Sequence, residues 1–137
     1  MKDLSPQLDP THLAVAQLPA GWQPPHLPDG QFTAVISSDL EVTVICPEPL
    51  LTVGDWSKDA IATDIGWRRI TFPGPLPWEM VGFLADVAGR LAGAQIPFTS
   101  VSGFTTDHVL VRAAQADLAV GVLSGEQPPP QRPGTNP

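Results

Sequence analysis

The side chains best suited to chemistry in this chain lie together in the short sequence SGFTTD, residues 102–107. Ser102, Thr105 and Thr106 offer hydroxyl groups, Asp107 offers a carboxylate, and Phe104 places an aromatic ring among them. Hydroxyl groups donate and accept hydrogen bonds, and a carboxylate can pair with an ammonium group. This combination favours binding of a small polar ligand. The alternative is that Asp107 is a turn residue that hydrogen-bonds its own backbone.

A second candidate feature is the turn Gly74-Pro75-Leu76, which precedes a helical stretch. A turn at a helix start exposes backbone N–H groups, and the helix dipole there favours an anion. Gly74 lets a ligand approach the backbone closely. An α-amino acid carries both a carboxylate and an ammonium group, so it suits this turn together with Asp107. The alternative is that the glycine only breaks the chain before the helix.

Other chemistry is excluded by residue type and spacing. His12, His26 and His108 show no metal-ligand spacing, and Cys46 is the only cysteine. No Gly-x-Ser-x-Gly sequence is present to hold a nucleophilic serine. Cys46 ends a predicted strand without a basic neighbour, so we expect a buried, unreactive thiol. We therefore expect no catalytic site, no metal and no cofactor.

Composition and charge limit the class of protein. A chain of 137 residues with 42% hydrophobic residues can form one domain, or two very small ones that share a core. Its net charge of −7, with seven Lys and Arg, argues against nucleic-acid and anionic-membrane partners. No apolar run approaches the roughly 20 residues that span a bilayer. The N-terminal sequence MKDLSPQLDP has no apolar signal core. We expect a cytoplasmic protein.

Apolar periodicity and turn residues predict the elements that must position these side chains. Strands are predicted at six places: His12–Leu18, Phe32–Ser37, Leu40–Cys46, Trp67–Phe72, Phe98–Phe104 and His108–Ala113. Met80, Leu84, Val87 and Leu91 recur at helical spacing and predict a helix at Pro77–Ala94. A second helix is predicted at about Ala114–Leu123, and at most a weak helix within Leu50–Thr63. The β-α-β-β-α order from Trp67 lacks one strand of a ferredoxin-like unit. His12–Leu18 is our candidate for that strand.

Charge and proline content describe the strand at Trp67 and the two ends of the chain. Arg68 and Arg69 place one charge on each face of a strand, and one of them can pair with an acid at a domain edge. The C-terminal sequence QPPPQRPGTNP, residues 127–137, contains five prolines and no large apolar side chain. Such a segment cannot bury enough surface to offset its ordering entropy. We expect loose tails at both ends.

The chain resembles the small ACT-domain proteins of the CASTOR/ACT type, which are related to the regulatory region of aspartate kinases. The resemblance is carried by LAVAQLP (13–19), LEVTVICPE (40–48), GWRRITFPGPLPWEMVGFLADVAGRLAGAQIPF (66–98) and SVSGFTTDHVLVR (100–112). Together these stretches extend over most of the chain between the two tails. Gln95 stands where the family usually has glycine.

The resemblance implies an α/β (α+β) fold of the ferredoxin-like ACT type, with antiparallel sheets and helices packed on one face. It implies a first ACT-like half at 12–65 and a second ACT domain at 66–125. The composition of the two ends predicts a flexible tail at 1–11 and a disordered Pro-rich tail at 126–137. The resemblance also implies a non-catalytic sensor that binds an amino acid at a domain or subunit interface. The alternative is an assembly module without a small ligand, which acts through protein–protein contacts. A homodimer and a protein partner are open in both cases.

Overall fold

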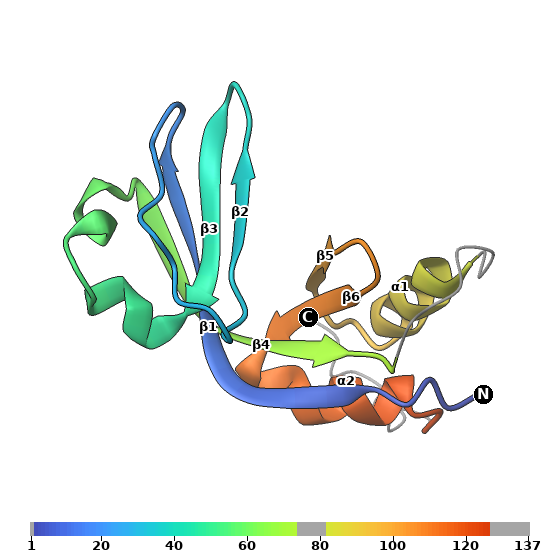
Figure 1. The fold of residues 1–137 in the computed structure, drawn as a ribbon. Coiled ribbons are helices and arrows are strands. Elements are labelled where there is room, and N and C mark those ends of the chain that lie inside the picture. Colours follow the sequence, from blue (N-terminus) through green and yellow to red (C-terminus); the bar gives the residue numbers. More distant parts are fainter. Residues whose placement is uncertain (1, 74–81, 127–137) are drawn as a thin grey trace, which may run out of the picture. The chain divides into compact units, whose positions relative to one another are not determined.

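The computed structural model describes residues 2–73 and 82–126. Its elements in chain order (Figure 1) are β1 Gln7–Pro19, β2 Ala34–Ser37, β3 Glu41–Pro47, β4 Ala62–Thr71, α1 Phe83–Gly93, β5 Phe98–Ser102, β6 Asp107–Arg112 and α2 Ala116–Leu123. Short 3₁₀ helices occupy Glu48–Thr52, Trp56–Asp59 and Ala113–Gln115. The predictions for residues 74–81 and for the C-terminal tail at 127–137 lie outside the described residues.

The strands are hydrogen-bonded in the order β2-β3-β1-β4-β6-β5. Strand β1 pairs antiparallel with β3 over Leu13–Pro19, and β2 pairs antiparallel with β3 in a hairpin. Strands β5 and β6 form the second antiparallel hairpin, from Phe98 opposite Val111 to Ser102 opposite Asp107. With six strands and two α-helices in the described residues, the mixed α/β, ferredoxin-like fold class predicted from the sequence is confirmed.

The chain divides into two compact units, which we call the first unit (Pro10–Arg68) and the second unit (Met1–Asp9 with Arg69–Pro137). Strands β1 and β4 contribute residues to both units. In the second unit, α1 and α2 flank the β5–β6 hairpin along the chain. In the first unit, the β2–β3 hairpin is flanked instead by an irregular segment at 20–33 and by two 3₁₀ helices. The first unit therefore has the order strand, hairpin, strand. The second has two strand segments followed by a hairpin, and it is the unit that contains α-helices among the described residues.

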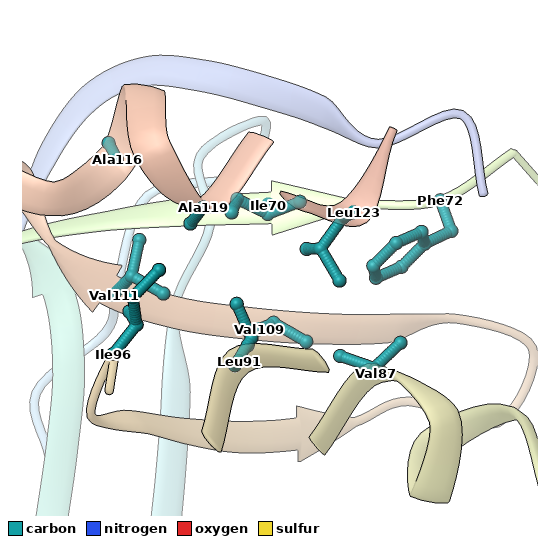
Figure 2. Close-up of a cluster of buried hydrophobic side chains, with 10 residues drawn as sticks. All are labelled: Ile70, Phe72, Val87, Leu91, Ile96, Val109, Val111, Ala116, Ala119 and Leu123. Carbon is teal, nitrogen blue, oxygen red and sulfur yellow. The ribbon is translucent and has the colours of Figure 1, made fainter. Parts of the chain in front are cut away.

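The core of the second unit is formed by apolar side chains of both helices and the strands that they cover. Figure 2 shows these side chains pointing toward one another, and ten of them are buried: Ile70, Phe72, Val87, Leu91, Ile96, Val109, Val111, Ala116, Ala119 and Leu123. Val87 and Leu91 follow the helical spacing predicted from the sequence. Leu84 belongs to the same predicted stripe but is 40% exposed, so the buried stripe of α1 is narrower than predicted.

The N-terminal segment corrects one prediction. We predicted a flexible tail at 1–11, but β1 begins at Gln7, and Leu4 and Leu8 pack against the core of the second unit. The Leu4 N–H also donates to the Leu123 carbonyl over 3.0 Å. The prediction was wrong because MKDLSPQLDP is mostly polar, whereas its two leucines find apolar partners far along the chain. Strand β1 is the neighbour of β4 in the sheet order, while its residues from Leu13 onward pair with β3.

Element boundaries also differ from prediction in the middle of the chain. Strand β4 begins at Ala62, earlier than the predicted Trp67, and β5 ends at Ser102, before the predicted Phe104. The weak helix predicted within Leu50–Thr63 is two 3₁₀ helices. The sequence ATDIG at the start of β4 lacks a run of β-branched residues, so pairing with neighbouring strands decides its conformation.

Helix α1 ends where the family resemblance suggested a glycine. Gln95 has a φ of 59°, in the left-handed region that glycine adopts most easily. The Ile96 N–H donates to the Leu91 carbonyl over 2.9 Å. This is the 6→1 hydrogen bond of a Schellman motif, which commonly ends a helix at a left-handed residue. Ile96 then enters the core, so the tight ending directs the chain back toward the sheet.

The buried guanidinium of Arg90 joins three segments of the second unit. It donates to both carboxylate oxygens of Asp86, over 2.9 and 3.3 Å, and to the carbonyls of Lys2 and Leu123, over 2.7 and 3.3 Å. The N-terminal segment and the end of α2 are therefore held to α1 by one side chain. A buried charge is tolerated only when its hydrogen bonds are satisfied, as they are here.

We predict that Arg90→Ala lowers the free energy of unfolding by about 2–4 kcal/mol, because it removes the donor to Asp86 and to the Lys2 carbonyl and one of the two donors to the Leu123 carbonyl. Urea denaturation measures this change. Lys58→Ala is the matched control, since Lys58 pairs with Asp55 at the surface over 3.2 Å, and it should cost less than about 0.5 kcal/mol. Equal effects of the two substitutions would contradict the role given to Arg90.

Candidate functional site

The β5–β6 hairpin brings together the two ends of the predicted SGFTTD site. Ser102 and Asp107 lie opposite each other in the antiparallel ladder. The Ser102 hydroxyl donates to Oδ1 of Asp107 over 2.6 Å. The Gly103 N–H donates to the Thr106 carbonyl over 2.8 Å and closes the turn. The carboxylate of Asp107 is therefore held in a fixed orientation at the base of the turn, where it is half-buried.

The remaining predicted site residues are less closely grouped. Thr105 and Thr106 are exposed, and Phe104 is 85% exposed at the tip of the turn. The predicted turn Gly74-Pro75-Leu76 lies outside the described residues. Within the described part of the site, Ser102, Thr106 and Asp107 are thus the predicted residues that share a hydrogen-bonded turn.

Gly103 allows this turn to be tight. A Cβ at this position would lie 2.6 Å from Oγ1 of Thr106, closer than real Cβ atoms approach. The hydroxyl of Thr106 lies 2.9 Å from Nε2 of His108, so it cannot move aside without losing that contact. Any larger residue at Gly103 would therefore disturb the link between the turn and His108.

Three further residues, which sequence reasoning did not place in the site, continue this network. Nη1 of Arg69 on β4 lies 3.2 Å from Nδ1 of His108 on β6, and Nη2 of Arg69 donates to Oδ2 of Asp9 on β1 over 3.1 Å. A guanidinium can only donate, so Nδ1 of His108 accepts and Nε2 carries the proton toward Thr106. We call the four residues Asp9, Arg69, His108 and Thr106 the polar chain.

The signals for the polar chain were only partly visible in the sequence. We predicted that Arg68 or Arg69 pairs with an acid at a domain edge, and the structure shows Arg69 paired with Asp9. Asp9 itself could not be recognised, because it falls in the segment predicted to be a tail. His108 was considered only as a metal ligand or a strand residue, and nothing in its local sequence indicates its contact with Arg69.

Burial lowers the pKa of His108 below its usual 6.5, and the positive charge of Arg69 lowers it further. The carboxylate of Asp107 acts in the opposite direction but is the smallest of the three influences. Loss of water around the imidazole disfavours its charged form, and so does a neighbouring guanidinium. The neutral ring that these effects favour is the form that can accept the hydrogen bond from Arg69.

Metal ligation and thiol chemistry find no support in the described residues. No three side chains of His, Cys, Asp or Glu come together there in a way that could hold a metal ion. Cys46 is buried in the core of the first unit, and burial raises its pKa to about 11, so the thiol stays protonated. Over residues 2–73 and 82–126, no helix is both long and apolar enough to cross a membrane.

A family model of the ACT domain matches residues 62–125. This range runs from the first residue of β4 through α1, the β5–β6 hairpin and α2. The match to residues 62–125 agrees with the family that the resemblance named. No curated protein matches the chain by sequence. The CASTOR/ACT subtype stays a prediction.

Several solved structures match the fold of this chain over about nine-tenths of its length. A protein from Agobacterium tumefaciens is 23% identical, with a TM-score of 0.77, covering 91% of this chain and 90% of its own. A Vibrio cholerae protein of unknown function, described as a possible transport protein, is 20% identical with a TM-score of 0.66, covering 90% and 89%. The regulatory subunit of aspartate kinase from Thermus thermophilus, in its ligand-free form, is 10% identical with a TM-score of 0.58, covering 93% and 100%. At these identities the likeness establishes the fold.

We predict that acidification destabilises the protein partly through His108. The folded-state pKa is lowered, so the unfolded chain binds the proton more readily once the pH falls to about 6.5 and below. His108→Gln should therefore lose less stability than the wild type between about pH 7.5 and about pH 5.5, as measured by urea denaturation. Thr106→Val retains the imidazole and should keep the wild-type pH dependence. An equal loss of stability on acidification in the wild type and in His108→Gln would contradict the lowered pKa of His108.

Proposed function

We propose that this chain is a non-catalytic regulatory protein that uses its ACT domain to sense an amino acid at an interface of that domain. The observation that carries the proposal is the 2.6 Å bond between Ser102 and Asp107, which orients a half-buried carboxylate beside the turn. A fixed carboxylate is the group that recognises an α-ammonium, because a charge-assisted hydrogen bond is stronger than a neutral one.

The ligand would be held by its two charged ends. Only Oδ1 of Asp107 takes part in the bond from Ser102, so the proposal assigns Oδ2 to the ligand ammonium. The ligand carboxylate is assigned to the backbone N–H groups of Gly74-Pro75-Leu76, with Pro75 lacking a donor. That half of the site stays a prediction.

Sensing requires that the ligand prefer one arrangement of the protein over another, because equal affinity for both shifts nothing. The polar chain supplies a physical connection for such a preference. A change at Thr106 alters the contact of His108 with Arg69, and therefore the pairing of Arg69 with Asp9 on β1. The likeness to a regulatory subunit of aspartate kinase supports this non-catalytic role. A protein partner and a cytoplasmic location are part of the same proposal.

A second candidate function, an assembly module without a small ligand, is favoured by strand β2. This strand is at one edge of the sheet order, and its sequence AVIS contains neither charge nor proline. Val35 is 39% exposed and Ile36 is 51% exposed. Natural edge strands are normally protected by charges, prolines or bulges, so an unprotected apolar edge is suited to pairing with another chain.

The sensor proposal predicts that one or a few of the twenty amino acids raise the melting temperature. Ligand at about 100 times its Kd stabilises by about 2.7 kcal/mol, which is a shift of several degrees for a protein of this size. Asp107→Asn should weaken the affinity for such a ligand by at least about tenfold in calorimetry, because a hydrogen bond to a charged group is lost. Asp39→Asn, at the turn of the β2–β3 hairpin, is the matched control and should bind normally. Unchanged affinity in Asp107→Asn would exclude Asp107 from the site.

The assembly proposal predicts a mass that increases with concentration in the wild type and not in Ile36→Lys, measured by analytical ultracentrifugation. A lysine on an edge strand opposes pairing through charge and length. Thr99→Lys, on edge strand β5, tests the other edge of the sheet order and should leave the association unchanged. A concentration-independent monomer that also ignores every amino acid would contradict both functions.

A further inference from the structure

The first unit contains a recess that neither candidate function uses. It has a volume of about 300 Å³ and is lined mainly by apolar side chains. Leu50 forms part of the lining and is 8% exposed, whereas Val53 beside it is 61% exposed. Leu27 and Trp56 are partly buried against the core of this unit and also line the recess. A volume near 300 Å³ is at the small end of ligand pockets, large enough for one aromatic ring with a short substituent.

Hydrogen bonds fix the aromatic wall of this recess. The Trp56 indole N–H donates to the Leu50 carbonyl over 2.9 Å, and the Ser57 hydroxyl donates to the Leu51 carbonyl over 2.6 Å. The indole of Trp22 lies 5.8 Å from that of Trp56, centroid to centroid, and its N–H donates to Asp59 over 3.2 Å. Since both indole N–H groups are engaged within the protein, the recess can recognise a ligand through ring faces and apolar contact.

The charges of the first unit and of the recess indicate that a cationic ligand fits best. Over Pro10–Arg68 the chain has seven carboxylates against two basic side chains, Lys58 and Arg68. Asp55 lines the recess and forms an ion pair with Lys58. Both side chains of this pair are largely exposed, Asp55 by 85% and Lys58 by 74%. Exposed pairs are weak, so another cation can share this carboxylate. The face of an indole ring also attracts cations and repels anions.

We propose that the recess binds a small aromatic or branched aliphatic cation, with the apolar part against Trp56 and Leu27 and the ammonium group near Asp55. This site is distinct from the β5–β6 hairpin, which belongs to the second unit. His26 is the other polar side chain that lines the recess. Asp55 supplies the carboxylate among the lining residues, and the ligand charge is therefore placed there.

Nuclear magnetic resonance of the full ¹⁵N-labelled chain tests the proposal directly. The chain has four tryptophans, and Trp56→Phe assigns the indole signal of Trp56. Three probes of similar size differ in charge: phenethylamine, 2-phenylethanol and phenylacetate. Phenethylamine should shift the Trp56 signal with a Kd of about 1–10 mM, the range open to so small a ligand. Phenylacetate should bind at least about fivefold more weakly.

Three variants test where the ligand charge is bound. Asp55→Asn should weaken phenethylamine binding by about two- to threefold, as expected for an exposed charge. Asp39→Asn removes the same charge from the same unit away from the recess and should have no such effect. Asp107→Asn should leave phenethylamine binding unchanged, so this site and the amino-acid site can fail separately. No shift of the Trp56 signal at about 10 mM, or equal binding of the three probes, would overturn the proposal.

Discussion

Strands β1 and β4 each contribute residues to both compact units, so the hydrogen-bond ladders of both units depend on the same two segments of backbone. This sharing constrains the polar side chains as well. Asp9 and Arg69 come from the parts of β1 and β4 that belong to the second unit, and their 3.1 Å ion pair joins the two strands. Arg69 then contacts His108 on β6. Because the strands fix these backbones, a change in one member of the polar chain must be accommodated by its neighbours.

The two units cover their strands in different ways, and this difference explains why the recess arises in the first unit. In the second unit, α1 and α2 supply Val87, Leu91 and Leu123 to a continuous core. In the first unit, residues 20–33 and the 3₁₀ helices supply Trp22, Leu27 and Trp56 instead. Irregular segments cannot present a regular stripe of side chains, so large aromatic rings span the distance, and a recess remains beside them. Because protein interiors are normally close-packed, a recess that remains in the first unit is a candidate ligand site.

The sequence was sufficient where a periodic pattern met a clear stop signal. Both hairpins and α2 were predicted from the sequence. The alternation that includes Val42 and Val44, and the helical spacing of Val87 and Leu91, correspond to side chains that are buried in the structure. Prediction failed where long-range contacts decided the outcome. Leu4 and Leu8 are ordered by the core of the second unit, and no local pattern indicates that partner. For the same reason the sequence placed Ser102 and Asp107 in the candidate site but missed Asp9, which is brought to Arg69 by strand pairing.

The Ser102–Asp107 bond has two roles that must be compatible if the hairpin is a ligand site. It closes the ladder of β5 and β6, and it orients the carboxylate that the proposal assigns to a ligand ammonium. Since Ser102 uses Oδ1, an ammonium on Oδ2 adds a contact without removing the one that closes the hairpin. Binding would then tighten the turn, and with it the contact of Thr106 with His108. A ligand of this kind favours the arrangement in which the polar chain is intact, which is the differential affinity that sensing requires.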